Sequence, residues 1–199
     1  FDGTGDYISA GNPTELQITG ALTVSAWFKI LNNSGDRVIV CRDNGNTSRN
    51  WFIYMASNGK IAAYVRKSDD SGWGGTTLSP SVYDDGNWHH VVMVYTPSTS
   101  LVLYIDGAAV NTDTTSITSS INNDQADLTI GMWSRNAPSP YSSNFWSGDI
   151  DEVAIWNRSL ALEDVQRIYN ATANNPGKTA NLFTAGLNTG LVYWNRMGD

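Results

Sequence analysis

The chain has 199 residues, of which 41% are hydrophobic and 16% charged, and its formal net charge is −7 at pH 7. This composition is typical of a folded domain with its own core and excludes a disordered chain. The chain is acidic and has no cluster of basic residues of the kind found in nucleic-acid-binding proteins. No apolar run approaches the ~20 residues that span a membrane. We therefore expect neither nucleic-acid binding nor membrane insertion.

Short runs rich in β-branched and aromatic residues follow one another between turn residues, which is typical of an antiparallel sandwich or barrel. In the clearest run, 22–31, apolar and other side chains alternate, so one face of this strand is expected to enter a core. Further strands are predicted, in chain order, at 37–41, 51–56, 60–66, 89–96, 101–105, 108–112, 127–132 and 149–156.

One helix is predicted near the C-terminal end. Ser159 suits the N-cap position, and apolar residues recur at helical spacing from Leu160 to Tyr169. The stretch 171–182, rich in Asn, Ala, Gly and Thr, is typical of a linker, and 190–199 predicts one more strand. We therefore expect a main domain at 1–170, followed at 171–199 by a linker and a C-terminal strand or the start of a next module.

Four segments resemble the laminin G-like, pentraxin-related domains of the concanavalin A-like lectin and glucanase superfamily. They are FDGTGDYI at 1–8, LTVSAWF at 22–28, GNWHHVVMVY at 86–95 with LVLYIDG at 101–107, and FWSGDIDEVAIWNRSL at 145–160. Their order and spacing match this family across 1–170. The resemblance implies an all-β fold in which two antiparallel sheets stack as a jelly-roll sandwich with one short C-terminal helix.

A structural calcium is the cofactor that the resemblance implies. Ca²⁺ prefers several carboxylate and carbonyl oxygens, and in this superfamily the aspartate at the position of Asp151 often holds such an ion. Asp149 lies two residues away and so shares a face of the strand with Asp151. Asp6 and the loop 3–5 would complete the site. The alternative is that these carboxylates cap turns or accept backbone N–H groups without metal.

Aromatic side chains in polar loops are the candidates for carbohydrate binding, because rings stack on the C–H faces of sugars and burial does not readily explain such residues. One such loop is 69–75, and the other is the long loop 134–147. The predicted ligand-binding residues are Trp73, Trp133 and Tyr141, with Asp43, Asn44, Arg135 and Asn136 as polar partners. The alternative is that the rings pack under their own loops or against a neighbouring module.

A pentraxin-type double-calcium site is not expected at Asp43 and Asn44. Such a site also needs an acidic cluster after a later strand, and Arg135 stands where a carboxylate would be required. These two residues are therefore retained as polar partners for a sugar, with an ordinary turn as the alternative.

Catalysis is not expected. The sequence has no Glu-x-Asp-x-Glu or Glu-x-Asp-x-x-Glu string to supply the paired carboxylates of a glucanase. His89 and His90 are adjacent on a strand, so they point to opposite faces and cannot share a base or a metal. We expect a non-catalytic extracellular binding module for a glycan or surface polysaccharide, as in lectins and adhesion proteins. The alternatives are a structural module that contacts other protein modules at a cell surface or in a phage virion, and a glycanase or polysaccharide lyase.

Overall fold

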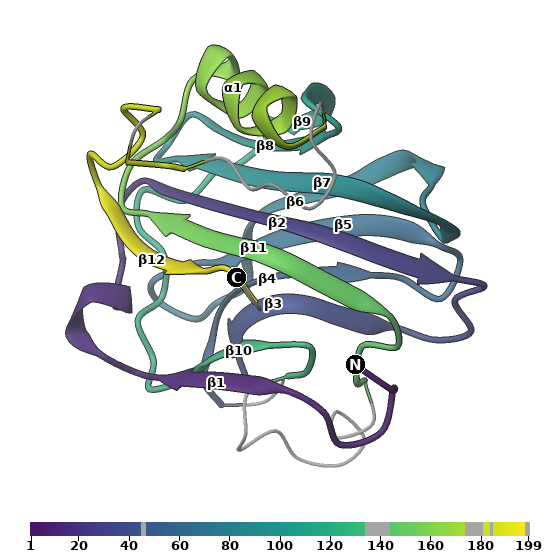
Figure 1. The fold of residues 1–199 in the computed structure, drawn as a ribbon. Helices are drawn as coiled ribbons and strands as arrows, with labels where there is room; N and C mark the ends of the chain where they lie inside the picture. The colour runs from purple at the N-terminus through teal and green to yellow at the C-terminus, as the bar shows by residue number, and fades with distance from the viewer. Residues whose placement is uncertain (45–46, 134–143, 174–180, 184, 198–199) are drawn as a thin grey trace.

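Two antiparallel sheets of six strands each face one another in the computed structural model, which describes residues 1–44, 47–133, 144–173, 181–183 and 185–197 (Figure 1). The strand orders are β1-β10-β3-β4-β5-β6 in one sheet and β12-β11-β2-β7-β8-β9 in the other. The strands are β1 Ile8–Gly11, β2 Leu22–Leu31, β3 Arg37–Asp43, β4 Arg49–Met55, β5 Lys60–Arg66, β6 Trp73–Val82, β7 Asp85–Thr96, β8 Ser100–Ile105, β9 Ala108–Asp113, β10 Leu128–Ile130, β11 Asp149–Trp156 and β12 Leu191–Asn195. The helices are the 3-10 helix η1 Thr14–Leu16 and the α-helix α1 Leu162–Ala173. This arrangement confirms the predicted all-β sandwich with one short helix near the C-terminal end.

The core lies between the two sheets and follows from the alternation of apolar residues. In β2, Leu22, Val24, Ala26 and Phe28 are all completely buried, as the pattern in 22–31 predicts. The facing side chains of the other sheet include Ile39, Trp51, Ile53, Ile61, Ala63 and Val65. Because successive side chains of a strand point to opposite faces, the residues between these positions are directed to the outside of the sandwich.

Helix α1 covers part of the outer face of the sheet that contains β2 (Figure 1). Val165 and Ile168 of the helix pack against Val92 and Val94 of β7 in a second apolar cluster. The outer face of this sheet is therefore buried where the helix lies over it. Within the described residues, none of the helices is long and apolar enough to cross a membrane.

The C-terminal segment belongs to the same sheet. Strand β12 pairs antiparallel with β11 as its edge neighbour. Upstream of β12, Leu182 and Leu187 are buried in the apolar cluster beneath α1, and the indole nitrogen of Trp156 donates a hydrogen bond to the carbonyl of Leu187 at 2.6 Å. The strand predicted in 190–199 is thus an edge strand of the sandwich.

The two long sides of the sandwich differ. On one side β6 and β9 are linked, because Asn111 donates to the carbonyl of Leu78 at 2.9 Å and the Asp113 carboxylate accepts from the Thr76 backbone at 2.9 Å. On the other side the edge strands are β1 and β12, one from each sheet (Figure 1). A pocket opens near this second side and is described below.

Strand β6 was not expected, because 69–75 was interpreted as a loop. Two glycines of this segment, Gly74 and Gly75, allow close packing within a strand. A Cβ atom on Gly74 would lie 2.5 Å from a methyl carbon of Thr118, and one on Gly75 would lie 3.2 Å from Leu101. Trp73 consequently lies at the start of a strand, opposite Arg66 of β5.

Candidate functional site

An aromatic cluster covers the outer face of the sheet that contains β3 to β6. Its members are Phe52 and Tyr54 from β4, Tyr64 from β5, Trp73 from β6, and Trp133, which follows β10. We call these five residues the outer aromatic cluster. Phe52 is its centre, with ring centroids 4.7 Å from Trp133, 4.9 Å from Tyr64 and 5.4 Å from Trp73. Two of the three predicted sugar-binding aromatics, Trp73 and Trp133, therefore contact the same phenyl ring.

Trp73 is half-buried and has two guanidinium groups beside its ring. The central carbon of Arg66 lies 5.1 Å from the ring centroid and that of Arg49 lies 5.4 Å away. Such cation–π contacts hold both groups in place. Arg66 also donates hydrogen bonds to the side chain and backbone of Asp70. The result is an aromatic surface with directed N–H donors at its margin.

Asp43 and Asn44 lie at the end of β3, next to this cluster. Asp43 is fully buried and pairs in the ladder with Arg49, which reaches Trp73. The side-chain oxygen of Asn44 accepts a hydrogen bond from the backbone of Ser48 at 2.9 Å. The structure thus brings Asp43 and Asn44 to the same end of the sheet as Trp73, but it holds Asn44 in a turn.

Three further predicted ligand-binding residues, Arg135, Asn136 and Tyr141, lie outside the described residues. Trp133 is more buried than a loop aromatic was expected to be, with 7% of its surface exposed. Trp133 packs edge-on against Phe52 at an interplanar angle of 73°, which is the geometry of a stable aromatic pair. Trp73 is therefore the better exposed of the two tryptophans.

Sequence reasoning missed Phe52, Tyr54 and Tyr64. For Phe52 and Tyr54 the signal was the alternation within 51–56, where Trp51 and Ile53 enter the core and the next residues must face outward. The same alternation within 60–66 turns Tyr64 outward. Burial raises the pKa of the Tyr54 hydroxyl well above its usual value, with the neighbouring Tyr64 hydroxyl adding to the shift.

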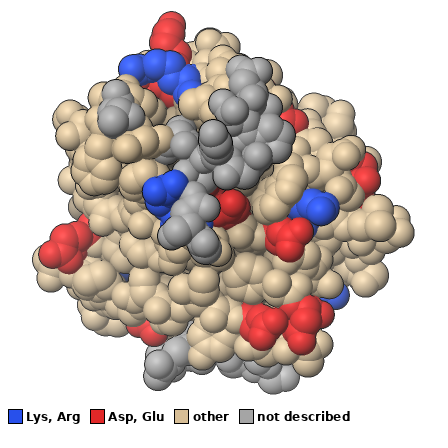
Figure 2. All heavy atoms as spheres, in the orientation of Figure 1, with Lys and Arg blue, Asp and Glu red and all other residues tan. Residues whose placement is uncertain are grey.

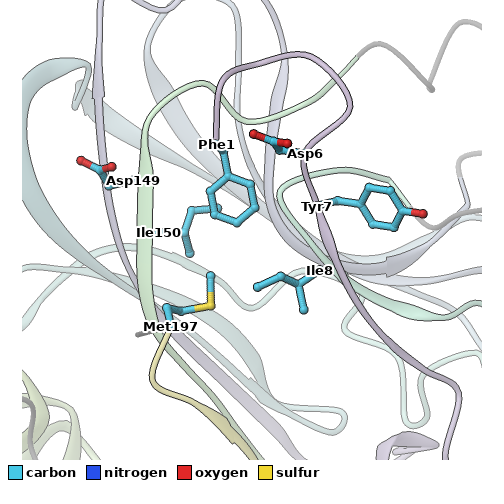
Figure 3. Close-up of a pocket in the computed structure, with 7 residues that line it drawn as sticks. All are labelled: Phe1, Asp6, Tyr7, Ile8, Asp149, Ile150 and Met197. Atoms are coloured by element: carbon cyan, nitrogen blue, oxygen red, sulfur yellow. The ribbon is translucent and has the colours of Figure 1, made fainter. Parts of the chain in front are cut away.

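The candidate calcium ligands are only partly brought together. Asp6 and Asp149 line a pocket of about 450 Å³ on the β1/β12 side of the sandwich (Figure 3). Asp6 accepts a hydrogen bond from the Asp2 backbone at 3.1 Å, and Asp149 lies 3.7 Å from the ammonium group of Lys29. The other residues that line the pocket are Phe1, Tyr7, Ile8, Ile150 and Met197.

Asp151 is not among the residues that line this pocket. Its carboxylate accepts a hydrogen bond from the Glu152 backbone at 2.8 Å. Across the described ranges, no group of three or more His, Cys, Asp or Glu side chains is arranged to hold a metal ion. The three aspartates therefore do not form a ready ligand set, and the structural calcium remains a prediction.

The two histidines point to opposite faces of β7, as the alternation predicts. His89 packs near Phe28 of the core, and its Nδ1 lies 2.8 Å from Asp106 and its Nε2 3.2 Å from Asp85. The hydrogen bond to Asp106 is the main reason why the pKa of His89 is raised. His90 faces the other way and is fully buried.

Ser25 and His90 form a close pair, with Ser25 Oγ 2.8 Å from His90 Nε2. This distance would suit a nucleophile and its base. However, the Ser25 and His90 side chains are both buried, and the His90 ring is stacked near Trp27 and Tyr169. Burial lowers the pKa of His90 to about 4. The pair has no open path to a substrate and serves the packing of this face.

Comparison with known proteins supports the resemblance noted in the sequence. A laminin G-type family profile, described as the concanavalin A-like lectin/glucanases superfamily, matches residues 2–166. No curated protein sequence gives a match.

Several solved structures share the fold. One is the carbohydrate-binding module CBM40 of the Ruminococcus gnavus IT-sialidase bound to α2,3-sialyllactose, with a TM-score of 0.62, 14% identity, and coverage of 83% of this chain and 96% of that chain. Another is the heptameric SAP-like pentraxin of Limulus polyphemus, with a TM-score of 0.58, 18% identity, and coverage of 82% of this chain and 80% of that chain. The botulinum neurotoxin serotype D ligand-binding domain in complex with N-acetylneuraminic acid has a TM-score of 0.62 and 17% identity, over 84% of this chain but only 40% of that one. At these identities the likeness shows the fold alone.

Proposed function

Because the chain belongs to the laminin G-type family of the concanavalin A-like lectin/glucanases superfamily, we propose that it is a non-catalytic, extracellular module that binds a glycan or surface polysaccharide. Proteins of similar fold support this proposal, since the CBM40 domain is bound to sialyllactose and the toxin domain to N-acetylneuraminic acid. The proposal rests mainly on the outer aromatic cluster, in which the half-buried Trp73 lies beside Arg49 and Arg66.

The chemistry of this surface suits a sugar. An indole ring packs well against the C–H face of a pyranose, and the sugar hydroxyls can accept hydrogen bonds from guanidinium N–H groups. A guanidinium also binds a carboxylate in a bidentate manner. Sialylated glycans are therefore among the first ligands to test against Trp73 and its two arginines.

The test is a glycan array followed by calorimetry with the ligands that bind, including 3′-sialyllactose and lactose. Replacing Trp73 with alanine should weaken binding about tenfold, because it removes one stacked aromatic contact of ~1.4 kcal/mol. The matched control is Leu78→Ala on the same strand, a residue that is 41% exposed and outside the cluster. Equal binding by Trp73→Ala and the wild type would place the site elsewhere, and a wild type that binds no glycan would contradict the proposal.

The structural calcium is a separate proposal with its own test. An ion that binds only the folded state raises the unfolding temperature. We expect calorimetric unfolding to shift to lower temperature when calcium is chelated, and we expect Asp6→Asn to remove this sensitivity because Asp6 lies in the pocket with Asp149. An unchanged unfolding temperature of the stripped wild type would rule out the ion.

A further inference from the structure

The geometry points to a second carbohydrate-binding surface, on the outer face of the other sheet, formed by Trp88, Lys29 and Asp149. We propose that this surface binds an uncharged oligosaccharide, with one sugar ring stacked on Trp88. The surface is separate from the outer aromatic cluster, which lies on the opposite sheet. It therefore adds a site to the function proposed above and can fail or succeed independently of Trp73.

The three side chains form one row across three neighbouring strands. Lys29 of β2 is the direct ladder partner of Trp88 on β7 and of Asp149 on β11. Neighbouring strands are ~4.8 Å apart, so the row is ~10 Å long, which is about the length of a disaccharide. Trp88 is 43% exposed, and the side chains of Lys29 and Asp149 are 41% and 57% exposed.

The next row along the same strands shows why the exposure of Trp88 matters. There Trp27 is the ladder partner of both His90 and Asp151. Tyr169 of α1 covers this row, with its ring 5.8 Å from that of Trp27. The indole of Trp88 lies one row farther on and keeps 43% of its surface in solvent. It is a large apolar ring on a regular sheet face where a ligand can reach it.

The charges of the row favour an uncharged sugar. Lys29 can donate to hydroxyl groups and Asp149 can accept from them, and the two are held 3.7 Å apart as a neutral pair. Acidic side chains are spread over this face, with a group at its lower edge (Figure 2). Asp6 lies with Asp149 at the pocket (Figure 3). An acidic sugar would meet like charge here, in contrast to the arginines beside Trp73.

The row shares Asp149 with the pocket described above. Phe1, Ile8, Ile150 and Met197 converge in the middle of the pocket, and Asp149 lies at its margin and points away from them (Figure 3). A sugar chain that stacks on Trp88 and reaches Asp149 would end at the margin of this pocket, whose volume is about 450 Å³. The length of the row favours a chain of at least two sugars over a single one.

The experiment is calorimetry of the full chain with cellotetraose and maltotetraose as uncharged probes and 3′-sialyllactose as the acidic probe. We expect at least one uncharged probe to bind the wild type. Trp88→Ala should weaken this binding about tenfold, equivalent to ~1.4 kcal/mol, and Trp88→Phe should retain part of it. Leu78→Ala is the matched control and should leave the binding of the uncharged probe unchanged, because Leu78 is exposed on the other sheet and lies outside both surfaces. Circular dichroism and urea unfolding verify that each variant is folded.

Four results would overturn the proposal. The first is that the wild type binds neither uncharged probe, and the second is that Trp88→Ala binds them as well as the wild type does. The third is that Trp88→Ala weakens only the binding of sialyllactose. The fourth is that Trp88→Ala changes only the self-association measured by light scattering. The last result would make the row a protein interface. If sialyllactose binding depends on Trp73 while these probes fail, the first proposed function stands and only the second surface is lost.

Discussion

From the burial of His90 we expect the folded state to lose stability in mild acid. The imidazole is fully buried, its Nε2 contacts Ser25, and its ring is stacked 5.1 Å from Trp27 with Tyr169 nearby. In the described part of the chain its Nδ1 has no hydrogen-bond partner. Burial lowers the pKa to about 4, and the nearby Asp106 offsets only part of this shift. Acidification from pH 7 to pH 5 is therefore the perturbation of interest.

The sign and size of the effect follow from proton linkage. In the unfolded chain a histidine has a pKa of ~6.5, so between this value and the folded pKa of about 4 the unfolded state binds more protons. Stability from this group is therefore full above pH 6.5 and is lost as the pH falls. Between pH 7 and pH 5 the loss amounts to about 2 kcal/mol of unfolding free energy. Most carboxylates titrate below this window.

Urea unfolding at pH 7 and pH 5 measures this effect. The wild type should lose about 2 kcal/mol more on acidification than His90→Gln, which cannot be protonated there. His89→Gln is the matched control with the opposite sign. The pKa of His89 is raised, chiefly by its hydrogen bond to Asp106, so its contribution is full below the unfolded pKa and is lost as the pH rises. The His89→Gln variant lacks this contribution, so it should lose more stability in acid than the wild type.

Two results would refute this reasoning. One is an identical pH dependence of stability in the wild type and His90→Gln. The other is an NMR titration in which the His90 ring takes up its proton near pH 6.5, the value for a solvated histidine. Either result would mean that water reaches the ring beneath α1.

Two substitutions test the packing of the sheet that contains β11. Trp156→Phe keeps an aromatic ring but removes the hydrogen bond to the Leu187 carbonyl. We expect the free energy of unfolding to fall by about 1 kcal/mol. Proteolytic cleavage of the C-terminal segment, followed by mass spectrometry, should be faster than in the wild type. Gly148→Ala would place a Cβ atom 2.2 Å from the Lys29 carbonyl oxygen at a φ of +147°, so we expect a loss of more than about 2 kcal/mol in urea unfolding. Gly35→Ala, where the added Cβ meets open space, is the control, and an equal loss in both variants would contradict the steric argument.

Much of the fold could be predicted because local alternation determines which face of a strand is buried. The strands at 22–31 and 149–156 have the expected bounds, and β2 buries the expected face. Strand β6 was missed because its start was interpreted as the polar loop 69–75. Gly74 packs against Thr118 and Gly75 against Leu101, residues that are distant in the sequence and adjacent only in the folded protein. No local pattern carries that information.

The candidate site was predictable in part for the same reason. The predicted aromatics Trp73 and Trp133 both contact the ring of Phe52. The strand of Phe52 was predicted, but the side chains on its outer face were not considered. The exposure of Trp88 was equally hidden, since it depends on where α1 stops covering the sheet. Asp6 and Asp149 share a pocket because the segment before β1 and the start of β11 lie at the same side of the sandwich, which is a property of the topology.

The position of the two chain ends has a mechanical consequence. Phe1 and Met197 line the same pocket (Figure 3), so a chain continued beyond both would enter and leave at one corner. The module would therefore be attached to the rest of such a chain at one corner only. Tension on the chain would then peel β1 from β10 and β12 from β11, one backbone hydrogen bond after another, before it loaded the central strands. Because β1 and β12 are edge strands of their sheets, the central strands of both outer faces would keep their pairing while these two open.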